Sequence, residues 1–177
     1  MTTTAKGTAD VNGRLWGARA RDWAEVQEGQ FAAAYHAVLA NAQVGPGTRH
    51  LDAGCGAGMA AALSASLGAT VSGLDASEPL LESLPWDDDS FDLVTGFNAF
   101  QFAGDAAYAL REAARVTRPG GRVVIMTWGD PEGMEAAAHV AALKPLLPPP
   151  PPGAPGPFAL SNEGALRGFA ADGGLIP

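Results

Sequence analysis

Residues 51–58, Leu51-Asp52-Ala53-Gly54-Cys55-Gly56-Ala57-Gly58, decide the fold of this 177-residue chain. The residues just before them, Thr48 to Asp52, predict a short strand. The Ala- and Leu-rich stretch after them, Met59 to Leu67, predicts a helix that stops at Gly68. A strand, a glycine-rich turn and a helix in succession place free backbone N–H groups and a positive helix end beside the turn. The turn is therefore predicted to hold a ligand against the main chain.

The spacing of the glycines limits which ligand suits this turn. A dinucleotide fingerprint needs G-x-G-x-x-G, but the third position counted from Gly54 and Gly56 is Met59. A Walker loop needs Gly-Lys followed by Ser or Thr, and the chain has no such triplet. The pattern present is acid-x-G-x-G-x-G, and Asp75 follows at the end of the next predicted strand, Ala69 to Leu74. A carboxylate at that place can accept hydrogen bonds from both hydroxyls of a ribose.

Strands and helices continue to alternate along the chain, which predicts an α/β fold. We expect a doubly wound, mostly parallel sheet with helices on both faces. A proline-rich stretch from Lys144 to Phe158 predicts polyproline II structure instead. The other expected elements are two N-terminal helices within 13–42 separated at Gly29, strands at 91–97 and 122–128, and helices at 105–116 and 162–171.

Four ordered motifs resemble those of class I S-adenosylmethionine-dependent methyltransferases, whose sheet is Rossmann-like. The first two are the glycine pattern of residues 52–58 and the carboxylate of Asp75. The third is Leu84 to Val94, LPWDDDSFDLV, and the fourth is Arg111 to Gly121, REAARVTRPGG. The last two are similar to motifs of the small-molecule branch that includes ubiquinone and menaquinone biosynthesis. The resemblance runs from about Trp16 to the end of the chain.

The resemblance implies which residues bind the cofactor, S-adenosylmethionine. The residues expected at its methionine and ribose end are Asp52, Ala53, Gly54, Gly56 and Gly58, with Phe97 and Asn98 facing the methionine part. Those expected at the ribose hydroxyls and adenine are Asp75, Ala76, Leu81 and Glu82. Asp75 read alone could also be a helix-entry residue, and Asn98 a turn residue.

The acceptor side is less defined by the motifs. Trp16, Trp23, Phe100 and Gln101 are its candidate residues, although the two tryptophans also suit the buried face of the N-terminal helices. His139 is the candidate catalytic residue, with a structural histidine as the alternative. No acid or base is required, because the sulfonium of the cofactor is already a methylating group. His50, in a predicted strand, is expected to be a hydrogen-bonded structural histidine.

Two places depart from the family pattern. Asp75 and Leu84 are nine residues apart, too few for the helix of ~10 residues and strand of ~5 found there in the family. The third-strand region and the C-terminal strands are therefore not evident. Either the full protein has residues between Ser77 and Leu84 that this sequence lacks, or the fold is shortened at its adenine side. We favour the first, because deleting a strand and its covering helix exposes core.

Composition excludes several classes of function. Net charge is −8 with a pI near 4.7, which is unlike a nucleic-acid-binding protein. The chain has no apolar run of ~20 residues and no secretory signal, so no membrane partner is expected. A single cysteine suits a cytoplasmic protein. Asp87-Asp88-Asp89 lacks the spacing of a metal site, so no metal is expected.

The sequence therefore predicts one domain over residues 1–177. Residues 13–43 would form a helical cap, 48–128 the cofactor-binding core and 129–177 a proline-rich acceptor-side region. The expected function is methyl transfer from S-adenosylmethionine to a small-molecule acceptor. Two alternatives stay open: a Rossmann-type NAD(P) oxidoreductase, and a non-catalytic member that binds the cofactor. Oligomeric state is not indicated.

Overall fold

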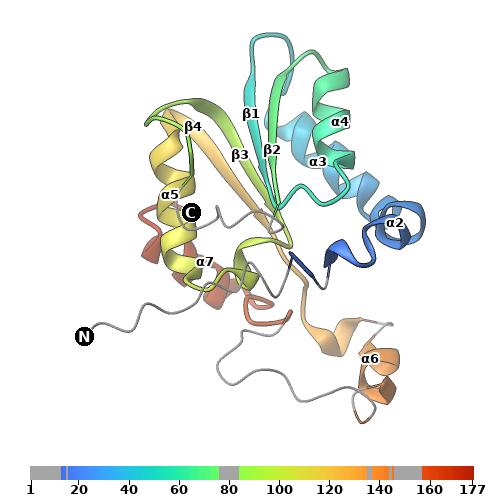
Figure 1. The fold of residues 1–177 in the computed structure, drawn as a ribbon. Coiled ribbons are helices and arrows are strands. Elements are labelled where there is room, and N and C mark those ends of the chain that lie inside the picture. The colour runs from blue at the N-terminus through green and yellow to red at the C-terminus, as the bar shows by residue number, and fades with distance from the viewer. Residues whose placement is uncertain (1–12, 15, 76–83, 135–136, 144, 146–156) are drawn as a thin grey trace.

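The computed structural model describes residues 13–14, 16–75, 84–134, 137–143, 145 and 157–177 (Figure 1). Its strands are β1 (Arg49–Ala53), β2 (Thr70–Leu74), β3 (Phe91–Phe97) and β4 (Thr117–Met126). The helices are α2 (Ala20–Asp22), α3 (Ala32–Asn41), α4 (Met59–Ser66), α5 (Ala106–Val116), α6 (Ala137–Leu143) and α7 (Glu163–Asp172). Shorter helical turns are η1 (Trp23–Gln27), η2 (Glu28–Phe31), η3 (Phe100–Phe102) and η4 (Pro131–Gly133).

The strands form a four-stranded parallel sheet in the order β2-β1-β3-β4. Asp52 of β1 is in register with Gly73 of β2 and with Thr95 of β3. Parallel strands have their carboxyl ends at one edge of the sheet, so the segments after β1, β2, β3 and β4 meet there. The predicted α/β fold with a parallel sheet is confirmed.

Helices cover both faces of the sheet (Figure 1). On one face α5 and α7 pack over a core cluster that contains Leu51, Val94 and Leu110, each fully buried. On the other face α3 and α4 enclose a smaller cluster that contains Tyr35, Ala60 and Phe97. Residues along one strand alternate between these faces, so His50 and Asp52 of β1 share the α4 side.

The N-terminal helices differ from the prediction of two helices separated at Gly29. The chain from Ala20 to Asn41 keeps a helical path, but it passes through a π-helical turn at η1 and a 3₁₀ turn at η2. Gly29 lies in the 3₁₀ turn and not in a break. Changes of helical pitch reposition side chains, and here they bring Glu28 into a buried position.

The last strand also begins earlier and ends earlier than the predicted 122–128. Thr117 already pairs with Phe91, and pairing resumes at Leu93 with Arg122. Pro119, Gly120 and Gly121 lie in an irregularity within β4, where Gly120 has φ +76°. The irregularity absorbs extra residues on one strand of the pair.

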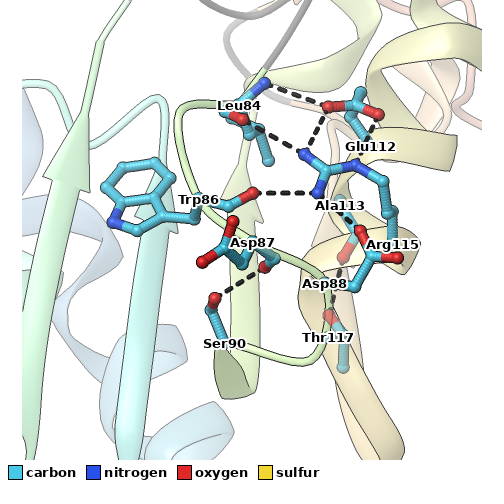
Figure 2. Close-up of polar contacts among 9 residues, drawn as sticks. All are labelled: Leu84, Trp86, Asp87, Asp88, Ser90, Glu112, Ala113, Arg115 and Thr117. Carbon is cyan, nitrogen blue, oxygen red and sulfur yellow. Dashed lines mark hydrogen bonds and ion pairs between the residues drawn. The ribbon is translucent and has the colours of Figure 1, made fainter.

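Arg115 of α5 anchors the segment that leads into β3 (Figure 2). Its guanidinium donates to the carbonyl oxygens of Leu84 at 3.1 Å and Trp86 at 2.8 Å, and to the carboxylates of Asp88 and Glu112. Glu112 also accepts the Leu84 N–H at 3.1 Å. Both main-chain polar groups of Leu84 are therefore bonded to α5, and we call this set of contacts the Arg115 clamp.

Asp92 holds the amino-terminal edge of the sheet together. It accepts hydrogen bonds from the backbone and guanidinium of Arg49 on β1 and from Arg118 on β4. The Arg49 contact is the main reason that the pKa of Asp92 lies far below its usual range. This edge lies opposite the carboxyl ends of the strands.

The departures from the family pattern are only partly visible. Within the described residues no strand pairs with the outer edge of β2, and none follows β4. The predicted gap near Leu81 falls on residues 77–83, which lie outside the described residues, and so do the prolines at 148–152.

Candidate cofactor site

The glycine loop after β1 has the backbone geometry that glycine permits. Gly54, Gly56 and Gly58 have φ of +78°, +55° and +93°, which L side chains rarely adopt. The N–H groups of Gly54 and Cys55 both donate to the Leu74 carbonyl, at 2.6 and 3.0 Å. The loop is thereby tied to the carboxyl end of β2 and leads directly into α4.

Asp75 contacts the glycine loop, as its place after β2 predicts. Its Oδ2 accepts the Gly56 N–H at 2.8 Å. Its other oxygen accepts no hydrogen bond within the part of the chain that the structure describes. The half-buried carboxylate therefore lies beside the loop with one oxygen available to a ligand.

Asp52 is the most buried carboxylate of the site, at 1% exposure. Its Oδ1 accepts a hydrogen bond from Thr95 at 2.8 Å. Its Oδ2 is buried and has no hydrogen-bond partner among the described residues. The pKa of Asp52 is raised to about 6, mainly by burial; the Thr95 bond opposes this shift, and Glu28 and Asp75 contribute to it. The Ala61 N–H, in the first turn of α4, also favours the charged form, although no hydrogen bond to Oδ2 is formed.

Glu28 is a site residue that the sequence analysis missed. It is buried at 4% exposure, and its Oε1 accepts the Met59 N–H at 3.1 Å, at the first residue of α4. A methyl group placed on Gly56 would lie 3.9 Å from the same oxygen. Glu28 forms no ion pair with any described residue. A glutamate within a helical, mostly polar segment gives no signal of burial in the sequence.

Aromatic side chains from the N-terminal segment line up beside the glycine loop. Trp23 Nε1 lies 3.3 Å from where a Cβ on Gly56 would be. The centroid of the Trp23 ring lies 5.5 Å from that of Trp16 and 6.0 Å from that of Phe31, on which it stacks. Phe31 in turn contacts Trp128, just after β4, at 5.4 Å. We call Trp16, Trp23, Phe31 and Trp128 the aromatic row. Of the predicted acceptor residues, Trp16 and Trp23 belong to it.

The residues after β3 divide between site edge and core. Asn98 has φ +53°, and its N–H donates to the Met126 carbonyl, so it joins the ends of β3 and β4. Gln101 is buried and donates to Asn98 Oδ1, whereas its own Oε1 has no partner among the described residues. Phe97 packs on Tyr35 at 4.6 Å. Phe100 is buried in the core cluster that also contains Leu51 and Ala53 of β1.

The unsatisfied polar atoms gather at one edge of the sheet. Among the described residues the buried side-chain oxygens without a partner are Asp52 Oδ2, Gln101 Oε1 and Thr127 Oγ1. Asp52 is in β1, Gln101 follows β3, and Thr127 follows β4. Buried polar groups are normally hydrogen-bonded. All three lie at or after the carboxyl end of a strand, the edge at which ligands bind in open parallel sheets.

Other predicted residues are not tested by this geometry. Ala76, Leu81 and Glu82 lie outside the described residues, as does the side chain of His139 in α6. Within the described part, no group of three or more His, Cys, Asp or Glu could hold a metal ion. Nor does that part contain a helix long and apolar enough to cross a membrane.

The parallel sheet, with main-chain amides and carboxylates at its carboxyl edge, defines a Rossmann-like α/β protein. Residues 51–125 match the family described as a methyltransferase domain. This match supports the resemblance seen in the motifs.

Named relatives support this family, and a solved structure shares the fold. The chain is 36% identical over 107 residues to malonyl-[acyl-carrier protein] O-methyltransferase of Erwinia pyrifoliae, covering 51% of this chain and 41% of the relative. It is 35% identical over 104 residues to demethylmenaquinone methyltransferase of Mycobacterium marinum, covering 50% and 45%. The chain thus spans less than half the length of these curated relatives. Its fold is similar, at TM-score 0.59 and 21% identity, to 1,6-didemethyltoxoflavin-N1-methyltransferase of Burkholderia thailandensis, over 73% of this chain and 68% of that chain.

Proposed function

We propose that this protein transfers a methyl group from S-adenosylmethionine to a small-molecule acceptor. The observation that carries the proposal is the set of unpartnered buried oxygens at the carboxyl edge of the sheet, beside the glycine loop. The methyltransferase domain over residues 51–125 supports the same reading. The structure similar to this fold was solved with S-adenosylhomocysteine bound, which also favours this cofactor.

The residues present fit this cofactor at three points. Asp52 Oδ2 is a buried acceptor for the N–H groups of its ammonium. Asp75 keeps one oxygen for a ribose hydroxyl while the other fixes the glycine loop. Gly54, Gly56 and Gly58 remove the side chains that would otherwise stand between the main chain and the ligand.

The protein's own contribution to the reaction is alignment and exclusion of water. S-adenosylmethionine supplies a methyl group on a sulfonium, so no acid or base of the protein is needed to activate it. The aromatic row presents an apolar surface beside the glycine loop, and an apolar surface keeps water from the reacting atoms. Gln101 and Thr127 offer polar contacts that orient a bound acceptor.

The acceptor is a small molecule in this proposal. The names of the demethylmenaquinone and 1,6-didemethyltoxoflavin methyltransferases support that class of acceptor. The net charge of −8 argues against a nucleic-acid acceptor, and the single cysteine suits a cytoplasmic location. We place cofactor binding in residues 48–128, with 13–43 and 129–177 on the acceptor side.

Isothermal titration tests the proposal. S-adenosylmethionine and S-adenosylhomocysteine should bind, and NAD should not; the reverse result would favour the oxidoreductase alternative. Asp75→Ala should weaken S-adenosylmethionine binding by about 1.5–3 kcal/mol, the value of lost charge-assisted hydrogen bonds. Asp87→Ala, at an exposed aspartate, is the matched control and should leave binding unchanged. No binding of either sulfur compound at millimolar concentration would refute the proposal, and binding without methyl transfer to any acceptor would identify a non-catalytic member.

A further inference from the structure

A row of buried polar side chains runs from α4 along one face of the sheet to the site. It consists of Ser64 on α4, His50 and Asp52 on β1, and Thr95 on β3. Three of them, Ser64, His50 and Thr95, are 0% exposed, and Asp52 is 1% exposed. Ser64 Oγ lies 2.8 Å from His50 Nδ1, His50 Nε2 lies 2.9 Å from Thr95 Oγ1, and Thr95 Oγ1 lies 2.8 Å from Asp52 Oδ1.

The direction of every hydrogen bond in this row follows from its last member. An ionised carboxylate only accepts, so the Thr95 hydroxyl donates its one proton to Asp52. Thr95 must then accept from His50 Nε2–H, and His50 Nδ1 must accept from the Ser64 hydroxyl. Burial lowers the pKa of His50 to about 4, so the ring is neutral near pH 7 and has the single N–H that this arrangement needs.

The row leaves Asp52 with one oxygen fixed and one free. Oδ1 is held by Thr95, whereas Oδ2 is buried and has no partner among the described residues. A carboxyl group with one oxygen bonded cannot rotate to satisfy the other within the protein. We propose that Thr95, backed by His50 and Ser64, is a positioning residue that holds Asp52 Oδ2 ready to accept a hydrogen bond from the methionine ammonium of S-adenosylmethionine. This inference rests on the proposed function.

The charges around Asp52 favour a cation as the ligand group. Glu28 from the N-terminal segment and Asp75 from the end of β2 both act on it, and both raise its pKa. The pKa of Tyr35 on α3 is raised by burial, then by Glu28 and then by Asp52. The pKa of Cys55 in the glycine loop is raised by burial and then by Asp52. His50, the remaining titratable neighbour, is neutral. An ammonium ion would therefore enter a site with negative groups and no facing cation among the described residues.

Loss of the Thr95 hydroxyl should act on the protonation of Asp52 as well as on its orientation. The Thr95 bond lowers the pKa of Asp52, so Thr95→Val should raise that pKa. A protonated Asp52 is a poorer acceptor for an ammonium. Affinity for S-adenosylmethionine in the wild type should fall as pH drops below about 6, and in Thr95→Val the fall should begin at a higher pH.

The test compares Thr95→Val with Thr95→Ser, which keeps the hydroxyl. S-adenosylmethionine, S-adenosylhomocysteine and adenosine are titrated calorimetrically from pH 5 to 9. At pH 8, Thr95→Val should bind both sulfur compounds about tenfold more weakly, the effect of one charge-assisted hydrogen bond. Thr95→Ser should restore both the affinity and the pH midpoint. Adenosine has no ammonium, so its affinity should be equal in all three proteins.

Three results would overturn the inference while leaving the proposed function intact. These are an unchanged affinity and pH midpoint in Thr95→Val, failure of Thr95→Ser to rescue, and an equal loss of adenosine binding. Absence of S-adenosylmethionine binding by the wild type would instead refute the proposed function. Where Thr95→Val does not fold, Ser64→Ala removes the far donor, and a wild-type pH midpoint in that variant would count against the row.

Discussion

Substituting alanine for Gly54 should destabilise the glycine loop in two ways, through steric overlap and through an unfavourable backbone conformation. A Cβ on Gly54 would overlap the Cβ of Ala99, far inside the ~3.5–4 Å separation at which carbon atoms attract. The residue also has φ +78°. Gly58 has φ +93°, but no atom lies within 4 Å of its would-be Cβ. Gly58→Ala is therefore the matched control, because it meets only the backbone cost.

The expected magnitudes follow from these two terms. An L side chain in the left-handed region costs roughly 1–2 kcal/mol. Overpacking a buried contact adds about 1–3 kcal/mol. Gly54→Ala should thus lower the free energy of unfolding by about 2–5 kcal/mol, and Gly58→Ala by about 1–2 kcal/mol. Adding Ala99→Gly should recover the overpacking part in the Gly54→Ala background only.

Urea denaturation of the four variants measures the comparison. Equal m-values would show that free energies, and not the unfolded states, are being compared. The coupling between Gly54→Ala and Ala99→Gly should favour the double variant by about 1–3 kcal/mol over additivity. Equal losses for Gly54→Ala and Gly58→Ala, with no coupling to residue 99, would refute the close approach of the loop to the segment after β3.

Three further predictions concern buried charges. Glu28→Ala should lower the free energy of unfolding by about 1 kcal/mol, because the Met59 N–H loses its acceptor. Glu28→Gln should lower it less, because the amide oxygen still accepts. Equal urea midpoints for the two variants would contradict this. The pKa of Asp52 is raised to about 6, so its contribution to the free energy of unfolding is complete below pH 4 and is lost as pH rises through 6. The pKa of His50 is lowered to about 4, so its contribution is complete above pH 6.5 and is lost as pH falls through 4. Between pH 4 and 6 the two contributions, about 3 kcal/mol each, should cancel in the wild type. Over this range the free energy of unfolding should fall with rising pH in His50→Gln, relative to the wild type. In Asp52→Asn it should rise. Arg115→Met should lower the free energy of unfolding by about 1.5–3 kcal/mol, because it leaves the buried carboxylate of Glu112 without its partner. Adding Glu112→Gln should reduce this loss.

Local sequence signals predicted the glycine loop and the carboxylate beside it, and the binding of the cofactor by these residues stays a prediction. Glycine spacing in residues 54–58 and the carboxylate after the next strand depend on neighbouring residues alone, and both lie where the motif predicts. The expected structural role of His50 is confirmed by its two hydrogen bonds, although its partners Ser64 and Thr95 are 14 and 45 residues away and could not be identified from sequence.

The parts that sequence failed to predict depend on tertiary contacts. Glu28 becomes buried because the helical pitch changes at η1 and η2, and hydrophobic spacing read at 3.6 residues per turn cannot detect such a change. β4 begins at Thr117 because Phe91 pairs with it across an irregularity that only the partner strand reveals. Thr127 directly follows β4, and a lone threonine after a strand gives no local signal.

The Arg115 clamp makes the sheet insensitive to the length of the connection that precedes it. Leu84 is fixed through its own N–H and carbonyl to α5, and Asp75 is fixed at the other end by Gly56. Residues inserted between these two points cannot transmit a shift into β3, since its approach is already bonded. Each doubling of a flexible connection costs only about 0.6 kcal/mol. Longer connections from methyltransferases of similar fold can therefore be grafted between Asp75 and Leu84 to build chimeras, with the register of β3 unchanged.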